Sequence, residues 1–442
     1  MPATDKTDIQ CVVAEEPAAY SDAIASSDED TPYTKVSEVT NGLKTVRIPK
    51  QTASFESLPS KKNHEAFIRT CVDVLLKEAV FEGTSRHNKV VDFHNPEELE
   101  KLFDFGLRND PSTHDALVKL LKDTVQYSVK TGHPYFVNQL FSSLDAYGLV
   151  GQWLTDSLNP SVYTYEVTPV FTLMEETVLR EMRRIVGFEE GRGDGIFCPG
   201  GSMANGYAIN CARYKFLPDV KTKGLHSLPR LVLFTSEDAH YSVSKMAAFL
   251  GIGTDNVYLV KTDARGRMDV DHLEQEVKRS ISEGWRPLYG QRHCRDDGDK
   301  HVQCGRRVDV LKFWFMWKAK GTSGLEQHID KVFENAKFFV DTIMHRPGFE
   351  LVVDEPECTN ICFWYVPPSL RGAKSHPDYV ERLHKVAPKI KERMMKEGTM
   401  MVTYQAVKRH PNFFRIVFQN SGLEKSDMLY LIEEFERLGK DL

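Results

Sequence analysis

The sequence lacks the features that mark several large classes of protein. No stripe of lysine and arginine occurs, and 57 basic residues face 63 acidic ones, so a nucleic acid is not expected as a partner. No stretch is apolar for long enough to span a membrane, and no membrane association is expected. Residues 1–10 have no apolar core of the kind that a secretory signal peptide needs. These absences predict a cytoplasmic protein.

Paired cysteine motifs are also absent. The eight cysteines form no Cys-x-x-Cys pair, which predicts reduced, buried or incidental thiols and no metal site. Cys358 and Cys362 are close enough to suggest a metal site, but a loop residue and a strand residue explain them better. Neither disulfide nor metal chemistry is therefore expected.

The sequence has 442 residues, of which 41% are hydrophobic. This is enough for one large and one small domain, each with its own core. Residues 1–60 carry ten acidic and five basic side chains without a sustained apolar period, so we expect a disordered acidic head. Beyond it we predict an N-terminal helical segment over 61–130, a large domain over 131–325 and a small C-terminal domain over 326–442.

Hydrophobic periodicity predicts a large domain in which helices and strands alternate, followed by a small α+β domain. Pro169 suits the start of one helix and Gly187 its C-cap. Leu231–Phe234 is a continuous apolar run, typical of a strand buried on both faces. The predicted helices are Glu65–Val80, Asp115–Thr131, Val170–Val186, Ser202–Phe216, Val270–Glu283, Arg306–Lys320, Tyr379–Lys396 and Ser426–Leu438. The predicted strands are Leu231–Phe234, Asn256–Lys261, Ile361–Val366 and Phe413–Phe418.

The segment Asp194–Asn205 runs through Gly200 and Gly201 directly into a predicted helix. The glycines let the backbone turn tightly, and Ser202 fits an N-cap. The free N–H groups of Ser202, Met203 and Ala204 would then suit a phosphate. Taken alone, a Gly-Gly-Ser sequence most often marks only the start of a helix.

Three further polar side chains are candidates for contact with a ligand. His240 follows a buried strand and could stack on a planar ring, although a loop hydrogen bond explains one isolated histidine better. Gln139, after Asn138, lies among apolar neighbours and needs a partner; on these residues alone a core-satisfied amide is favoured over a substrate contact. Arg415, inside an apolar strand, needs a carboxylate, for which an internal partner is favoured over a substrate.

Together these motifs resemble the group II pyridoxal-phosphate (PLP) decarboxylases, in the branch of cysteine sulfinic acid and insect aspartate decarboxylases, with glutamate decarboxylase next. The similarity covers residues 65–289 and 297–442, and Phe141–Asp145 resembles the sulfinate and aspartate branch more than the glutamate branch. Segments that resemble the family occur in family order: His133–Leu140, Tyr163–Glu175, Asp194–Asn205, Phe234–Ser242, Gly298–Gly321, Ser369–Gly372 and Asn412–Arg415.

This resemblance implies a role for each candidate residue. Ser202 and Met203 would hold the cofactor phosphate, His240 would stack on the pyridine ring, Gln139 would touch the substrate, and Arg415 would bind its α-carboxylate. It also implies a PLP-dependent transferase-like fold (fold type I) with a small α+β C-terminal domain, working as a homodimer on a small acidic or sulfinic amino acid.

One departure from the family is as informative as the similarity. Family members follow a segment like Gly284–Tyr289 with a Thr-rich loop, a strand bearing the Asp that pairs with the pyridine nitrogen, and an Asn-Pro-His-Lys whose lysine forms the Schiff base. None of these occurs here. The chain instead passes near residues 290–296 into Asp297–Arg306, which resembles sequence well downstream. His384-Lys385, the remaining His-Lys pair, matches a different family segment.

The resemblance therefore predicts a large domain with an incomplete central sheet, no catalytic lysine, and PLP binding that is weak and non-covalent at best. The chain alone is expected to be inactive. It would be a decarboxylase by descent, a non-catalytic variant that dimerises with a full-length relative, or an incomplete gene model. Intact motifs on both sides of one clean junction favour a recent deletion over slow decay.

Overall fold

The structure is a computed structural model that describes residues 61–288 and 303–442, apart from residues 108, 142, 227, 304, 408 and 409. The chain divides into two units, Met1–Ala66 and Phe67–Leu442. The predicted acidic head and the junction near residues 290–296 lie outside the described residues. The domain boundaries given above stay predictions.

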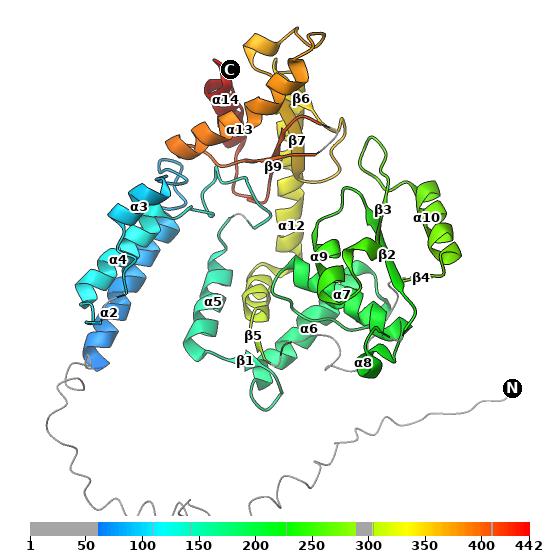
Figure 1. Cartoon of the computed structure of the whole chain (residues 1–442). Helices are drawn as coiled ribbons and strands as arrows, with labels where there is room; N and C mark the ends of the chain where they lie inside the picture. Colours follow the sequence, from blue (N-terminus) through cyan, green and yellow to red (C-terminus); the bar gives the residue numbers. More distant parts are fainter. Residues whose placement is uncertain are drawn as a thin grey trace, which may run out of the picture. The chain divides into compact units, whose positions relative to one another are not determined.

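The N-terminal helical segment contains three α-helices and a π-helical turn (Figure 1). Two predicted helices are confirmed here, with ends that differ by a few residues. The unforeseen helix begins at Pro96, where Asn95 and Glu98 form a reciprocal capping box. The elements are α2 (Lys61–Val74), the π turn η1 (Leu75–Phe81), α3 (Pro96–Leu102) and α4 (His114–Tyr127).

The large domain places helices around a parallel sheet of order β3-β2-β4 among the described residues. The predicted parallel α/β arrangement is thus confirmed. Pro169 occupies the first turn of α6, and Gly187 caps its end at φ 100°. The strands are β2 (Leu231–Ser236), β3 (Val257–Val260) and β4 (Arg286–Pro287). The helices are α5 (Ala146–Leu158), α6 (Pro169–Val186), η2 (Glu189–Gly191), α7 (Gly201–Phe216), α8 (Val220–Lys223), α9 (Ser242–Phe249), η3 (Thr254–Asn256) and α10 (Val270–Ser282).

Strand β2 is the centre of this sheet, as its continuous apolar sequence predicts. Leu231, Val232 and Leu233 are consecutive and all buried. Consecutive residues of a strand point to opposite faces, so both faces of β2 are covered. Leu231 and Leu233 pack with Ala247 of α9 and with Ile252 beyond it. This packing fixes α9, and hence the turn before it, at the carboxyl end of the strand.

The helix predicted over Arg306–Lys320 begins later than expected. Residues 306 and 307 form β5 (Arg306–Arg307), which pairs antiparallel with β1 (Ser161–Val162). Helix α12 (Val310–Met344) follows, with an interruption at Gly321, whose φ is 68°. The helical prediction was wrong for the first four residues, because residues 306 and 307 pair as a strand and residues 308 and 309 lead from it to the helix. The predicted helix end at Gly321 is confirmed.

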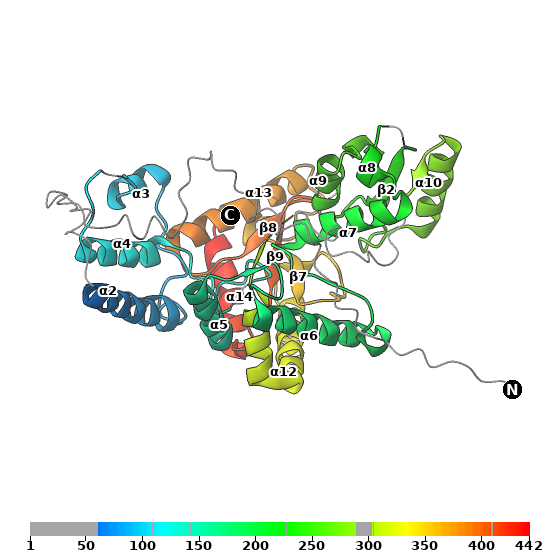
Figure 2. The same ribbon diagram turned by 90° about the horizontal axis from the view of Figure 1, so that it is seen from below.

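The C-terminal domain is a four-stranded antiparallel sheet of order β6-β7-β9-β8, packed against α13, α14 and the second half of α12 (Figure 2). Ile361, Phe363, Phe414 and Ile416 alternate along β7 and β9 and enter the main hydrophobic core. Cys362 and Arg415 lie between them in sequence and therefore point to the other face. The elements are β6 (Phe349–Leu351), β7 (Asn360–Tyr365), η4 (Pro368–Leu370), α13 (Tyr379–Glu397), β8 (Thr403–Gln405), β9 (Phe413–Val417) and α14 (Lys425–Gly439).

Candidate functional site

The start of helix α7 presents free backbone donors, as the sequence predicts for a phosphate site. The first bond of the helix runs from Ala204 N to Gly200 O, at 3.2 Å. Among the described residues, the N–H groups of Gly201, Ser202 and Met203 donate to nothing. Such donors at a helix N-terminus suit an anion.

One detail of this helix start differs from the prediction. Ser202 was expected to be the N-cap, but the N-cap is Gly200, at φ 91° and ψ 161°. Glycine reaches that conformation without strain, so the helix begins before the serine. Ser202 is half-buried in the first turn, and its backbone N–H remains available.

His240 lies in the turn between the carboxyl end of β2 and the start of α9. Its side chain is exposed, and its ring centroid is 4.2 Å from that of Tyr241. The backbone N–H of Ser242 donates to Nδ1 at 3.2 Å. In the neutral ring this bond assigns the proton to Nε2. The structure thus contains the hydrogen bond within the loop that was the alternative explanation for this histidine. One face of the ring can still stack on a ligand.

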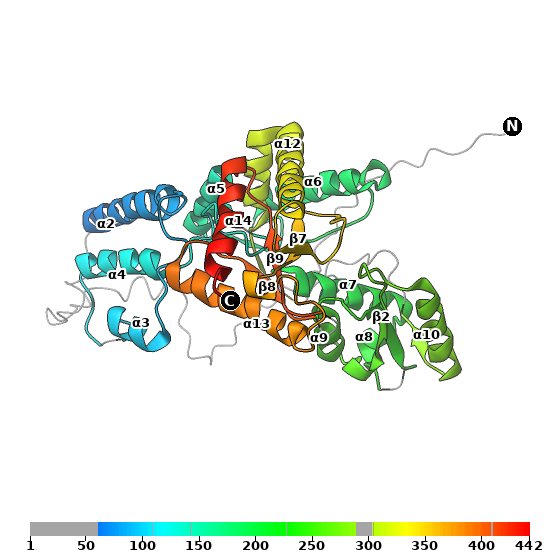
Figure 3. The same cartoon turned by 90° about the horizontal axis from the view of Figure 1, so that it is seen from above.

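The phosphate and ring candidates belong to neighbouring elements. Asn205, one turn into α7, donates from Nδ2 to the hydroxyl of Ser242 at 2.9 Å. Helices α7 and α9 pack against each other (Figure 3). The Met246 side chain lies close to Gly206. Ser202 and Met203 thus share one side of the sheet with His240. We call residues 200–205 and 240–242 the phosphate-and-ring half-site.

Gln139 follows a short extended segment that joins the C-terminal sheet. Val137 N donates to Met401 O at 3.1 Å, and Val137 O accepts from Val417 N at 2.9 Å. Gln139 is half-buried, and its amide bonds to no described residue. Asn138 does have a partner, since its Oδ1 accepts from the Lys391 ammonium at 3.4 Å. The core-satisfied interpretation therefore applies to Asn138, while Gln139 is available for a ligand.

Arg415 lies on the face of the C-terminal sheet opposite to the main hydrophobic core. Cys362 and Thr403 are its partners on the two neighbouring strands. Its Nε is buried and has no hydrogen-bond partner, and no described carboxylate pairs with it. Burial raises the pKa of the Cys362 thiol to about 11, although the nearby Arg415 charge opposes that shift. The internal carboxylate favoured from the sequence is thus absent from the described residues. A half-buried guanidinium whose Nε has no partner is well suited to a carboxylate ligand.

Gln139 and Arg415 are the candidates for a second half-site. Hydrogen bonds from the 135–137 segment reach Met401 and Val417, two residues from the paired Thr403 and Arg415. Among the described residues, no hydrogen bond or ion pair connects this pair to the phosphate-and-ring half-site. Sequence reasoning missed Ser242 and Lys391, since nothing in the local pattern distinguishes a linking serine or a buried lysine from a surface residue.

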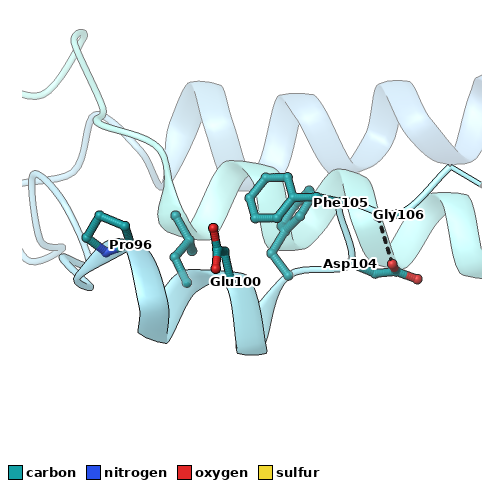
Figure 4. Close-up of a pocket in the computed structure, with 7 residues that line it drawn as sticks. Pro96, Glu100, Asp104, Phe105 and Gly106 are labelled. Carbon is teal, nitrogen blue, oxygen red and sulfur yellow. Dashed lines mark hydrogen bonds between the residues drawn. The ribbon is translucent and has the colours of Figure 1, made fainter.

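A cavity of about 560 Å³ lies elsewhere, beside helix α3 (Figure 4). It contains none of the residues predicted from the sequence. Gly106 N donates to Asp104 at its edge, at 3.1 Å. Its lining residues are Pro96, Leu99, Glu100, Phe103, Asp104, Phe105 and Gly106.

Two other kinds of site are absent from the part of the chain that the structure describes. It contains no cluster of three or more His, Cys, Asp or Glu side chains arranged to hold a metal ion. None of its helices has the length and apolar character that crossing a membrane requires.

Comparison with known proteins assigns the family. The pyridoxal-dependent decarboxylase conserved domain matches residues 96–292 and 289–366. Human cysteine sulfinic acid decarboxylase is 42% identical over 495 aligned positions, which cover 88% of this chain and 100% of that protein. The acidic amino acid decarboxylase GADL1 of Xenopus tropicalis is 39% identical, covering 86% and 93%. This chain belongs to the PLP-dependent decarboxylases, as its motifs predicted.

Solved structures agree with this assignment. The crystal structure of mouse CSAD has a TM-score of 0.82 and 40% sequence identity, and the match covers 86% of this chain and 99% of that one. The structure of Oryza sativa TDC with PLP has a TM-score of 0.75 at 18% identity, which establishes the fold only. The predicted fold class, a PLP-dependent decarboxylase fold with a small α+β domain, is confirmed. Within this family the chain is similar to cysteine sulfinic acid decarboxylase and GADL1.

The alignment with the human enzyme is longer than this chain. It has 495 positions, whereas 88% of 442 residues is about 389. About 106 positions of the human enzyme's alignment therefore have no residue of this chain opposite them. The two parts matched by the family domain meet at residues 289–292.

Proposed function

We propose that this chain descends from a decarboxylase of small acidic or sulfinic amino acids and is catalytically inactive on its own. The observation that carries the proposal is the junction after Tyr289. The sequence contains no Asn-Pro-His-Lys, and the family domain matches in two parts that meet there. The excess length of the alignment supports an internal omission.

The residues that remain fit part of the cofactor. The three free N–H groups at the start of α7 suit its phosphate, and the exposed ring of His240 suits stacking on its pyridine. We infer that Ser202, Met203 and His240 hold PLP weakly and without a covalent bond. When bound, PLP supplies an electron sink for the bond that breaks as carbon dioxide leaves.

Substrate recognition follows from the second half-site. The buried Nε of Arg415 has no carboxylate partner in the described residues, so its guanidinium is proposed to bind the α-carboxylate of an amino acid. The amide of Gln139 would hold another polar group of the same molecule. Aspartate, cysteine sulfinate and glutamate are the candidate substrates of a full-length form, and human cysteine sulfinic acid decarboxylase, 42% identical, supports this class.

The chain is proposed to lack the means to orient the cofactor and the substrate for catalysis. The rate of such a reaction depends on a fixed geometry and on the exclusion of water. The two half-sites are not connected by hydrogen bonds or ion pairs within the described residues, and the family segment that carries the lysine has no counterpart in this sequence. Without a lysine to hold the cofactor covalently, neither condition is met.

The proposal predicts no enzymatic activity from the isolated chain. Purified protein with PLP should release carbon dioxide from aspartate, cysteine sulfinate or glutamate no faster than PLP alone. The measurement is trapping of labelled carbon dioxide, with human cysteine sulfinic acid decarboxylase as the positive control. A saturable rate well above the PLP background, lost on Arg415→Ala, would overturn the proposal.

A second measurement asks whether another lysine has taken over. Lys245 is a candidate, because its ammonium lies 4.6 Å from the ring centroid of Tyr241, next to His240. Borohydride reduction with PLP, followed by peptide mapping, should yield no stoichiometric phosphopyridoxyl-lysine. Full labelling at Lys245 that disappears in Lys245→Arg would contradict non-covalent binding.

The alternative is a non-catalytic variant that pairs with a full-length relative through the family's dimer surface. Exposed apolar side chains on α5 and α6 favour it. Leu154, Leu158, Val170 and Leu173 are each 44% to 58% exposed, and exposed apolar residues that form a patch can mark a contact surface. A cytoplasmic location remains part of this proposal.

A further inference from the structure

Ser242 connects the two parts of the phosphate-and-ring half-site. Its hydroxyl accepts a hydrogen bond from Asn205 of α7 at 2.9 Å, while its backbone N–H donates to His240 Nδ1 at 3.2 Å. The residue is completely buried. One side chain and its own backbone thus join helix α7 to the ring of His240.

These two bonds have different consequences. The bond to Asn205 fixes the start of α9 against α7, one turn beyond Ser202. The bond to His240 fixes the rotation of the imidazole about its side chain, and it keeps the proton of the neutral ring on Nε2. A shift of Ser242 would therefore move the ring relative to the phosphate site and release its tautomer.

We propose that Ser242 is a positioning residue that sets the distance and orientation between the phosphate-binding helix start and His240. It acts through His240 and does not touch the cofactor. The inference rests on the proposed binding of PLP by these residues, but its structural part is independent of ligand. It predicts a defined state of the His240 ring even in the unliganded protein.

The chain offers a matched control in Ser280. Both serines are completely buried, and the Ser280 hydroxyl donates to Val277 O at 2.8 Å within α10. Ser242→Ala and Ser280→Ala delete the same atom from the same degree of burial. An effect on stability alone should therefore be common to both variants.

The experiment combines nitrogen-15 NMR of the His240 side chain with titration of PLP, followed by absorbance. Native protein should have the Nε2–H tautomer. Ser242→Ala should give a mixture of tautomers and weaken PLP binding about fivefold, the equivalent of one buried hydrogen bond. Ser280→Ala should match native protein in both measurements, and Ser242→Thr should restore them. In a His240→Ala background, Ser242→Ala should weaken PLP no further.

The outcomes separate the two proposals. Native protein that does not bind PLP would remove the proposed cofactor site, and the tautomer of His240 would then decide the role of Ser242 by itself. If Ser242→Ala fails to fold, Asn205→Ala removes the same bond from an exposed residue and should release the tautomer likewise. An unchanged His240 signal in that variant, or the same change in Ser280→Ala, would reduce Ser242 to a packing residue.

Discussion

Lys391 is a lysine whose charged form destabilises the folded protein. It is largely buried, and its hydrogen-bond partner in the structure is a neutral amide oxygen, Oδ1 of Asn138 at 3.4 Å. Burial lowers the pKa of the amine from 10.5 to about 8. The unfolded chain thus holds this proton more tightly than the native protein does. The loss of stability caused by burying the charged amine is therefore complete below pH 8, and it disappears as the pH rises from 8 to 10.5.

We expect Lys391→Met to stabilise the protein at neutral pH. A shift of this size corresponds to about 3 kcal/mol, and the lost hydrogen bond offsets about 1 kcal/mol of it. The free energy of unfolding should rise by about 2 kcal/mol at pH 7, and the gain should shrink toward pH 10. Urea unfolding of both proteins at the two pH values measures it.

A control for this variant lies one and a half turns earlier on the same helix. Lys385 is exposed and pairs with Glu381 at 2.6 Å. Exposed pairs contribute about 0–1 kcal/mol, so Lys385→Met should change stability little. A loss of stability in Lys391→Met at pH 7, or a gain of equal size at both pH values, would show that the lysine has better partners in solution.

At the scale of elements, the chain after the junction attaches to the chain before it through β5. Arg306 forms a bidentate ion pair with Glu175 of α6, at 2.6 and 2.8 Å. Glu175 also accepts from Phe197 N at 3.1 Å. Both charged side chains are nearly buried, 12% and 11% exposed. The neighbouring Arg307 pairs with Asp156, and both of those side chains are more than half exposed.

Arg306→Met should therefore be strongly destabilising, whereas Arg307→Met should not. Removing one partner of a buried pair costs about 3–5 kcal/mol because the other charge is left without compensation. The exposed pair contributes at most about 1 kcal/mol. Thermal unfolding of the two variants compares them directly. Equal losses would mean that Arg306 does not dock on α6 in solution.

The elements that sequence predicted best are those with a strong local signal. Helix α6 was found because Pro169 and Gly187 mark its ends, and β2 because an apolar run of that length is typical of a buried strand. Strand β5 was missed because the local pattern of Arg306–Lys320 is helical, and only the distant partner Ser161–Val162 makes its first residues a strand. Local propensity cannot report such a pairing.

The candidate site also contains features that the sequence predicts and features that only the folded structure reveals. The donors of α7 follow from Gly200 and Gly201, which are visible in the sequence. The unsatisfied Nε of Arg415 depends on what the rest of the fold fails to supply. The link through Ser242 depends on the packing of two helices 37 residues apart. Such relations arise only when the chain is folded, so sequence gave candidate residues without their connections.

At the scale of the whole molecule, the exposed apolar side chains of α5 and α6 bear on association. Helix α5 also packs along α12. Lys320 of α12 forms an ion pair with Asp145, which is the N-cap residue of α5. The exposed face of α5 is thus held on a fixed support. Symmetric dimers bury the same patch on both partners, so a chain that retains this surface should pair with itself or with a full-length relative.

We expect the purified chain to be dimeric by light scattering and to co-purify with a tagged full-length relative. The double variant Leu154→Asp, Leu158→Asp should abolish both interactions, because two carboxylates would lose their hydration in the contact. Ile281→Asp is the matched control, since Ile281 is 58% exposed on α10, away from α5 and α6, and should leave association unchanged. A native chain that stays monomeric and does not bind the relative would remove the partner role and leave an inactive descendant or an incomplete gene model.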